Sequence, residues 1–319
     1  MVRALRRHGL AAAILLAALH SSSAEDALKI AVGQRGGWEQ CVSELGQNAG
    51  MFRKHNLVLD ILYTQGSAET LQSVISGSVD IGIGLGTHAL LGAYGKGAPV
   101  RAIGASFTSA DDQFYYVPAE SPIRDMKDAD GRTIATSTTG SASHMFALAL
   151  ARHFGVNLKP QPTGNYASTL TQTLTKQVDI GFSQAPFNLT AVEEGKIRII
   201  ARGRDVPELR NMTSRLIVAN ADTLARRQDV FVRFMAGFRE TIDWLYSDPA
   251  AIKAYAAWSG LPERIARQAP EFLTRENLDP TRIAGLDGVM ADAVKFKYLP
   301  APLSEAQLGE LIQIPAPGR

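Results

Sequence analysis

Short apolar segments alternate with stretches of helical spacing through the first two thirds of this chain, and the alternation limits the folds open to it. Within residues 38–52, apolar side chains recur three and four positions apart, as they do on the buried face of a helix. Strands separated by single helices form a mostly parallel sheet with right-handed crossovers. An α/β fold is therefore expected. The strand candidates are residues 28–32, 57–63, 79–83, 100–104, 131–136, 178–182 and 197–201.

One helix–strand unit occurs twice, at a constant offset of 99 positions. In each copy, two apolar residues four positions apart precede the same four-residue segment, Val-Asp-Ile-Gly. A chance likeness between two ordinary units is the alternative. Because residue type, order and spacing all agree, we interpret the copies as corresponding parts of two lobes of similar construction. The first copy contains Leu71, Ile75 and residues 79–82, and the second contains Leu170, Leu174 and residues 178–181.

The last third of the chain, from about Asp222 onward, has an almost entirely helical pattern. Its most regular part carries an apolar stripe, which is more typical of a helix packed on a core than of a cofactor site. Asp248 and Pro249 together form a start signal for a further helix. The stripe consists of Phe231, Phe234, Met235, Phe238, Ile242 and Leu245.

The first 24 residues have the three-part layout of a secretory signal peptide. Three arginines precede an uninterrupted apolar run of 11 residues, and small residues follow at 22–24. A membrane-spanning helix needs about 20 apolar residues, so the run is too short to serve as an anchor. We expect cleavage after Ala24 and export to the periplasm.

The charge balance changes when this leader is set aside. The chain has 33 basic and 31 acidic residues, and the leader holds three of the basic ones, so the other 295 residues carry 30 and 31, a net charge of −1. No basic cluster indicates a nucleic-acid partner. The length suffices for about two domains. Cys41 is the single cysteine, which excludes an internal disulfide and favours a buried structural thiol.

Four motifs follow one another in the amino-terminal half of the chain: residues 48–57, Gly66-Ser67, Leu71-Gln72 and residues 76–82. Together they resemble the solute-binding proteins of ABC importers. The likeness is to the subgroup that serves sulfonates, taurine, nitrate and thiamine-pyrimidine precursors. It extends to the carboxy-terminal helices and so covers nearly the whole chain after the leader. The motifs are specific for the superfamily and do not name the ligand.

This resemblance implies the type II periplasmic-binding fold. Two α/β lobes, each a mostly parallel sheet flanked by helices, would be joined by a two-strand hinge, with the helical carboxy-terminal region on lobe one. Lobe one would comprise residues 25–110 and 208–319, and lobe two residues 111–207. The chain would cross between the lobes near 106–114 and return near 203–215.

The resemblance also implies a function. The protein would be the periplasmic substrate-binding component of an ABC-type importer, a non-enzymatic monomer without a cofactor. It would bind a small organic solute, a sulfonate-like anion as our first expectation, between its lobes. Its partners would be the membrane permease subunits, which work with a cytoplasmic ATPase.

The ligand contacts are expected at the turns that follow the strands. Ligands of open α/β sheets bind beyond the carboxyl ends of strands, where helix amino termini favour anions and glycines allow close approach. Plain helix capping is an equally good explanation for each serine or threonine taken singly. The candidates of lobe one are Gln34, Arg35, Gly36, Gly37, Trp38, Gln65, Gly66, Ser67, Gly86, Thr87 and His88. Those of lobe two are Thr138, Thr139, Gly140, Ser141, His144, Asn165, Tyr166, Ser183, Gln184 and Pro186.

Arg35 is the sharpest single candidate, because a guanidinium holds a carboxylate or sulfonate through paired hydrogen bonds. A solvated loop charge is the alternative. For an anionic ligand, Arg35→Ala is expected to weaken binding roughly ten- to a hundredfold. Trp38 is interpreted either as a stacking partner for a flat ligand or as a core residue. His88 and His144 are more often caps or packed residues than ligand contacts.

Other classes of function find less support in the sequence. The histidines lack the paired spacing of a helical zinc site, and neither a phosphate-loop motif nor a nucleophile elbow occurs. Gly82, Gly84 and Gly86 imitate a dinucleotide fingerprint, but Ala89 replaces its later glycine. Two alternatives stay open. One is a biosynthetic enzyme on the same scaffold, similar to fungal pyrimidine synthases, although those carry a cysteine-rich segment. The other is a ligand-sensing module for a signalling partner.

Overall fold

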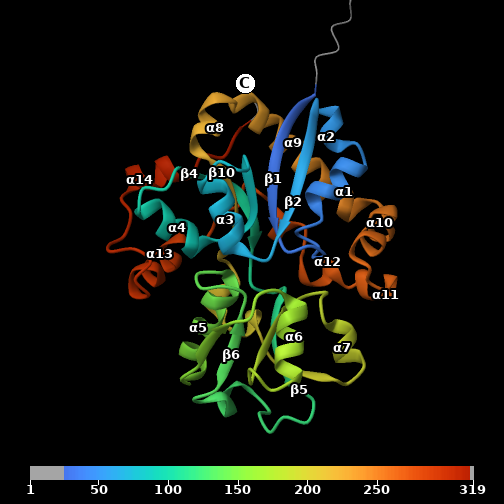
Figure 1. Ribbon diagram of the computed structural model, residues 1–319, viewed down its shortest axis with the longest axis vertical. Coiled ribbons are helices and arrows are strands. Elements are labelled where there is room, and N and C mark those ends of the chain that lie inside the picture. The colour runs from blue at the N-terminus through green and yellow to red at the C-terminus, as the bar shows by residue number, and fades with distance from the viewer. Residues whose placement is uncertain (1–24, 317–319) are drawn as a thin grey trace, which may run out of the picture.

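The computed structural model describes residues 25–316, and Figure 1 shows them folded into two lobes. Lobe one, at the top of the view, contains the first strands together with the carboxy-terminal helices. Lobe two, below it, is built from the middle of the chain. The expected signal peptide, residues 1–24, lies outside the described residues. Within the described part of the chain, no helix has the length and apolar character needed to cross a membrane.

A five-stranded sheet forms the centre of lobe one, in the order β2-β1-β3-β10-β4. Strand β1 pairs in parallel with β2 and β3, whereas β10 pairs antiparallel with β3 and β4. The strands are β1 (Asp26–Gly33), β2 (Leu57–Thr64), β3 (Ile81–Gly86), β4 (Val100–Thr108) and β10 (Thr213–Asn220). The helices between them are α1 (Val42–Asn48), α2 (Met51–Lys54), α3 (Ser67–Ile75) and α4 (Thr87–Gly95).

Lobe two repeats this plan with one reversed strand of its own. Strand β5 pairs antiparallel with β8 and β9, while β6 pairs in parallel with β7 and is linked in parallel to β8 by a bridge from Ile134 to Ile180. The strands are β5 (Gln113–Pro118), β6 (Thr133–Thr136), β7 (Lys159–Pro162), β8 (Gly181–Gln184) and β9 (Ile197–Arg202). The helices are α5 (Ala142–Phe154), α6 (Tyr166–Leu174) and α7 (Leu189–Glu193).

The predicted fold class is confirmed by this architecture. The sheet of lobe one is mixed, with β10 running against the other strands, and in lobe two β5 runs against β8 and β9 in a three-stranded sheet that the Ile134–Ile180 bridge joins to the parallel pair β6-β7. Strand β5 follows the segment 109–112 and strand β10 follows the segment 203–212. Along these two segments the chain passes between the lobes. Short 3₁₀ turns, Gly203–Asp205 and Pro207–Leu209, occupy the second segment.

The carboxy-terminal helices pack on lobe one. The apolar stripe predicted on α9 (Gln228–Ser247) is buried in the core under the sheet. The helix expected over residues 38–52 is instead two helices, because Gly50 takes a left-handed conformation (φ 78°) between α1 and α2. The other helices are α8 (Ala221–Arg226), α10 (Pro249–Ser259), α11 (Glu263–Ala266), α12 (Ala269–Phe272), α13 (Leu286–Lys295) and α14 (Glu305–Leu311).

The internal repeat has a structural counterpart in both lobes. The aspartate of each Val-Asp-Ile-Gly segment accepts a hydrogen bond from a backbone N–H of the neighbouring strand, at 2.8 Å from Lys29 and 2.9 Å from Thr133. In each lobe, a threonine hydroxyl at or directly after the end of one strand also lies 2.6 Å from a threonine hydroxyl in the first turn of the next helix. The pairs are Thr64 with Thr70 and Thr163 with Thr169.

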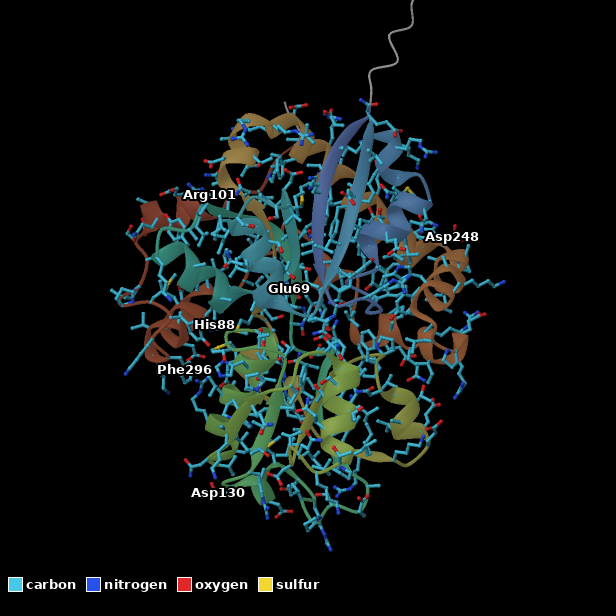
Figure 2. The ribbon with its side chains drawn as sticks, viewed as in Figure 1. Glu69, His88, Arg101, Asp130, Asp248 and Phe296 are labelled. Atoms are coloured by element: carbon cyan, nitrogen blue, oxygen red, sulfur yellow. The ribbon has the colours of Figure 1, made fainter. Side chains whose placement is uncertain are left out.

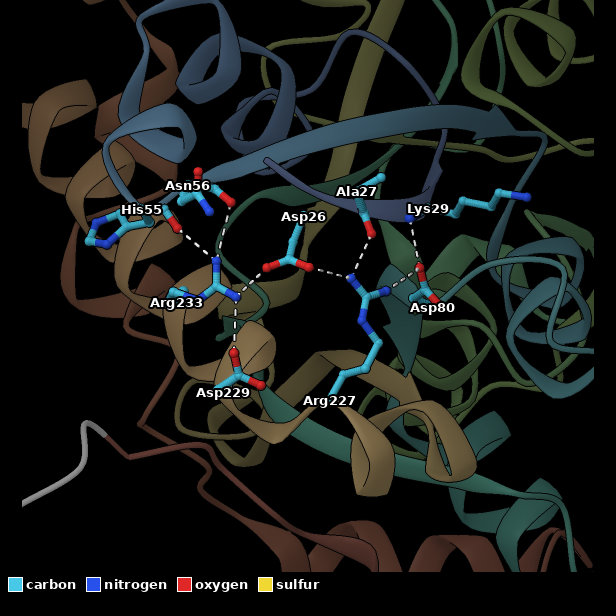
Figure 3. Close-up of polar contacts among 9 residues, drawn as sticks. All are labelled: Asp26, Ala27, Lys29, His55, Asn56, Asp80, Arg227, Asp229 and Arg233. Carbon is cyan, nitrogen blue, oxygen red and sulfur yellow. Dashed lines mark hydrogen bonds and ion pairs between the residues drawn. The ribbon is translucent and has the colours of Figure 1, made fainter. Parts of the chain in front are cut away.

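A polar network fastens α9 to the start of β1 (Figure 3). Arg233 donates to the Asp26 carboxylate at 2.5 Å and to the carbonyl oxygens of His55 and Asn56 at 3.0 and 3.2 Å. The hydrogen bond from Arg233 holds the pKa of Asp26 below its ordinary value. Ionised Asp26 therefore stabilises the fold above its ordinary pKa, and this contribution is lost as the pH falls through the lowered pKa.

Candidate functional site

The two lobes touch where their strands end. The side-chain oxygen of Gln65 in lobe one accepts a hydrogen bond from the Asn165 amide of lobe two at 2.8 Å. The backbones approach closely at Gly86, where an added Cβ would lie 2.7 Å from the carbonyl oxygen of Gly140. The structure thus has the lobes in a closed arrangement.

A polar cavity, which we call the inner pocket, lies between the lobes at this junction. The centre of a water molecule can occupy about 30 Å³ of this cavity, which leaves space for roughly two waters. Most of its side chains are neutral hydrogen-bonding groups. Its lining consists of Gly33, Gln34, Gln40, Gly66, Ser67, Gly84, Gln113, Ser137, Ser141, Ala142, Ser143, Tyr166, Phe182, Gln184 and Arg215.

Three helices begin at the inner pocket. Ser67, Ala142 and Tyr166 are the first residues of α3, α5 and α6, and each lines the cavity. Figure 2 shows Glu69, in the first turn of α3, near the line where the lobes meet. Helix α3 begins without a side-chain cap. First-turn N–H groups and the helix dipole favour an anion at such a place.

A buried guanidinium forms part of the pocket wall. Arg215, on β10, donates through Nε to Glu39 Oε2 at 2.6 Å and through Nη2 to Asp112 Oδ2. Its Cζ also lies 4.6 Å from the centre of the Phe107 ring. The third nitrogen, Nη1, is buried and has no hydrogen-bond partner within residues 25–316. One nitrogen of the Arg215 guanidinium is thus available to donate a hydrogen bond to a ligand.

Other polar atoms of the pocket wall are also unsatisfied. A buried polar group without a partner destabilises a protein by about 1–3 kcal/mol, so native structures rarely keep several together without a ligand or water. Those buried and lacking a partner among the described residues are the amide atoms Gln34 Oε1, Gln40 Oε1, Gln113 Oε1 and Gln184 Nε2. Their concentration around one cavity indicates a binding site for a polar group.

A second cavity, the outer chamber, adjoins the inner pocket and shares Gln34 and Tyr166 with it. Its volume is about 350 Å³. Aromatic rings form much of its wall, so it suits the less polar part of a solute. It is lined by Gln34, Arg35, Tyr63, Thr64, Gln65, Asn165, Tyr166, Ala167, Phe187 and Asn188.

Arg35 lies at the rim of the outer chamber rather than in the inner pocket. Its guanidinium donates to the Trp258 carbonyl at 2.7 Å, lies 4.6 Å from the centre of the Trp258 ring, and is 3.7 Å from Glu44. Its side chain is 47% exposed. These contacts within lobe one occupy the guanidinium and leave it about half exposed to water, where a charge interaction is weak.

We therefore expect Arg35→Ala to weaken binding of an anion by less than about tenfold, below the range that its loop position predicted. Calorimetric titration of the anion that binds the wild-type protein measures the change. Arg53→Ala is a matched control, because within residues 25–316 its exposed side chain forms an ion pair with Glu25 alone, at 3.4 Å and outside both cavities. A loss of a hundredfold or more in Arg35→Ala would assign the anion to the rim instead.

Nine of the predicted contacts line a cavity: Gln34, Arg35, Gln65, Gly66, Ser67, Ser141, Asn165, Tyr166 and Gln184. The others lie outside both. Trp38 belongs to the core of lobe one, where its indole N–H donates to the Tyr246 hydroxyl at 2.9 Å. The hydroxyls of Thr87 and Ser183 donate to backbone carbonyls. The remaining residues outside the cavities are Gly36, Gly37, Gly86, His88, Thr138, Thr139, Gly140, His144 and Pro186.

The two predicted histidines lie beside the pocket, at the lobe junction. His144 Nδ1 lies 3.0 Å from the Tyr298 hydroxyl and accepts a hydrogen bond from the Gly140 N–H at 3.2 Å. Burial, followed by the charge of His144, lowers the pKa of His88 to about 3. Burial also lowers the pKa of His144. Burial thus disfavours the charged form of both rings at the lobe junction.

Sequence reasoning missed most of the deep wall. Arg215 offered the one visible signal, since it is a charged residue inside an apolar strand pattern. The residues that it pairs with, Glu39 and Asp112, stand 176 and 103 positions away, so no local motif links them. The cavity-lining residues that were missed are Gly33, Gln40, Gly84, Gln113, Ser137, Ala142, Ser143, Phe182 and Arg215 for the inner pocket, and Tyr63, Thr64, Ala167, Phe187 and Asn188 for the outer chamber.

Two α/β lobes with a polar pocket between them define a protein of the periplasmic binding protein fold. The NMT1/THI5-like family model matches residues 45–252, and the chain belongs to that family. None of the curated proteins compared with the sequence matches it significantly.

Solved structures of the same fold cover nearly the whole chain. The periplasmic aliphatic sulphonate-binding protein SsuA of Escherichia coli has a TM-score of 0.72 at 18% identity, covering 92% of this chain and 94% of that one. The alkanesulfonate-binding protein SsuA of Xanthomonas axonopodis pv. citri, bound to MOPS, has 0.73 at 18%, covering 90% and 98%. The nitrate-binding protein NrtA of Synechocystis has 0.70 at 11%, covering 90% and 86%. At these identities the likeness establishes the fold alone.

Proposed function

We propose that this protein is the substrate-binding component of an ABC-type importer and that it binds a small organic anion between its lobes. The observation that carries the proposal is the pairing of two adjoining cavities. The inner pocket has room for a head group and presents helix amino termini and Arg215 Nη1 to it. The outer chamber offers an aromatic wall to an organic tail.

The structural relatives support this class of ligand. Two of them are named for binding sulfonates and a third for binding nitrate, all of which are oxyanions. The proposal includes a periplasmic location, reached through cleavage of the leader after Ala24, and delivery of the solute to membrane permease subunits. The two lobes would close on the solute as units. Lobe one would comprise residues 25–110 and 208–319, and lobe two residues 111–207.

The enzyme alternative draws no support from the single cysteine. The Cys41 thiol is buried and donates to the Trp38 carbonyl at 3.0 Å, and burial raises its pKa well above the ordinary value. A cysteine nucleophile needs the opposite setting, partly exposed and with a lowered pKa. Cys41 also lines neither cavity.

Calorimetric titration of a defined panel tests the proposed ligand class. The panel contains 1-butanesulfonate, MOPS, nitrate, butyrate and a neutral aminopyrimidine, each titrated into protein freed of co-purified solute by unfolding and refolding. We expect one-to-one binding of a sulfonate, with the organic sulfonates ahead of nitrate because only they fill the outer chamber. Saturable binding of the neutral pyrimidine, with no anion bound, would contradict the proposal.

A further inference from the structure

The buried charges beside the inner pocket do not balance. Glu39, Asp112 and Arg215 form one cluster with two carboxylates and one guanidinium, so the fully ionised cluster carries one net negative charge. Their side chains are 1%, 0% and 6% exposed, respectively. A buried charge without compensation is strongly disfavoured, and an anion arriving at Arg215 adds a second negative charge to the same place.

Asp112 is the member of the cluster that is free to take up a proton. Both oxygens of Glu39 accept hydrogen bonds, one from Arg215 and the other from the Ser106 hydroxyl. Asp112 uses only Oδ2 for Arg215, whereas its Oδ1 is buried and has no partner within the described chain. A proton on Oδ1 would leave the ion pair between Arg215 and Glu39 intact.

The surroundings of Asp112 favour protonation near neutral pH. Burial is the main cause that raises the pKa of Asp112 to about 6, and Glu39 adds to the rise while Arg215 opposes it. The other titratable groups facing the cluster are Tyr115 of β5 and Tyr166 of α6. Burial raises the pKa of both phenols, so they stay neutral and provide no compensating charge.

We propose that Asp112 takes up a proton from solvent when an anionic head group enters the inner pocket, so that solute and proton bind together. This inference rests on the proposed function, because only an anionic solute creates the extra negative charge. No covalent bond to the solute forms. The carboxylate gains one proton, so the occupied site carries one negative charge fewer than it would with Asp112 ionised.

The sign of the pH dependence follows from this linkage. Burial raises the pKa of Asp112 to about 6 before an anion is present in the pocket, and a bound anion raises this pKa further. Between the two pKa values, affinity falls by up to about tenfold for each unit of rising pH, because one proton is taken up on binding. Below about pH 6 the affinity levels off, since the free protein already holds the proton.

Calorimetric titration of 1-butanesulfonate at pH 5.5, 7.0 and 8.5 tests the proposal. At pH 7.0, titrations in imidazole and Tris buffers, which differ in ionisation heat and contain no sulfonate group, report proton uptake directly. We expect uptake of up to one proton and weaker binding at pH 8.5 than at pH 5.5. In Asp112→Asn, both the uptake and the pH dependence should vanish. Asp111→Asn should keep them, because Asp111 is a neighbouring carboxylate outside the cluster of Glu39, Asp112 and Arg215.

The outcomes separate the two proposals. Equal affinity for butanesulfonate at all three pH values, with no buffer-dependent heat, overturns the proton linkage and leaves the anion site standing. Persistence of the linkage in Asp112→Asn overturns the assignment to Asp112. If the wild-type protein binds none of the anions at any pH, the proposed ligand class fails and the linkage fails with it. The wild-type titrations decide the first and third outcomes without any variant.

Discussion

Replacing Gly86 with alanine is expected to reduce solute affinity by about a hundredfold or more while each lobe keeps its fold. The added Cβ would lie 2.7 Å from the Gly140 carbonyl oxygen and 3.1 Å from the Ala142 nitrogen, both on the opposite lobe. These are backbone atoms, so no side chain can move aside to relieve the clash. Gly86 has φ −60°, which alanine adopts without strain.

The expected loss in Gly86→Ala follows from the contacts that closure supplies. If the lobes stay apart, Ser141 and Gln184 of lobe two cannot reach a solute held by lobe one. Two lost hydrogen bonds to a charged group correspond to about 3 kcal/mol, or roughly a hundredfold in affinity. Titration of 1-butanesulfonate measures it. Gly288→Ala is the control, because a Cβ there would have no atom of the described residues within 4 Å beyond its chain neighbours and its own helix. Wild-type affinity in Gly86→Ala would show that binding does not need this closed arrangement.

Replacing Arg215 with methionine is expected to be the most destabilising substitution in the site. The change leaves Glu39 and Asp112 buried without their shared counter-charge, and breaking a buried pair in this way typically costs about 3–5 kcal/mol. It also removes Nη1 from the inner pocket, so anion binding should be lost. Methionine keeps much of the apolar volume that packs against Phe107.

Chemical denaturation at several pH values measures this effect. The stability deficit of Arg215→Met should shrink as the pH falls from 8 toward 5, because burial raises the pKa of Asp112 and its protonation removes one of the two uncompensated charges. Arg53→Met is the control, since the Arg53 side chain is 81% exposed and its ion pair contributes little. Near wild-type stability of Arg215→Met at pH 8 would mean that the buried cluster does not carry the charges assigned to it.

The fold was predictable because its signals are local. Alternating apolar segments and helical spacing lie within single elements, and the repeat at an offset of 99 positions indicates two lobes from the residue pattern alone. The split of the helix at Gly50 was not predictable from the pattern, because a left-handed glycine between two helices leaves the apolar spacing unchanged. The apolar spacing indicates which face of a helix is buried, but it does not show whether one helix continues without a break.

The candidate site was only partly predictable, for a physical reason. Ser141 shows why capping and ligand contact could not be told apart: it accepts a hydrogen bond from the His144 N–H and also lines the inner pocket. The position of Arg35, after a strand and beside two glycines, predicts an anion contact, yet its guanidinium is held at the rim by Trp258. The importance of Arg215 depends on tertiary structure, because the strand β10 places it beside Glu39 and Asp112, which are distant in the sequence.

Small-angle X-ray scattering tests most directly the central claim, that a solute is held between two lobes that close on it. The wild-type protein and Gly86→Ala would be measured with and without saturating 1-butanesulfonate. The account predicts that the radius of gyration of the wild-type protein falls on binding to the value of the closed structure, while that of Gly86→Ala does not change. A wild-type protein that binds one equivalent of butanesulfonate with an unchanged radius of gyration would contradict it.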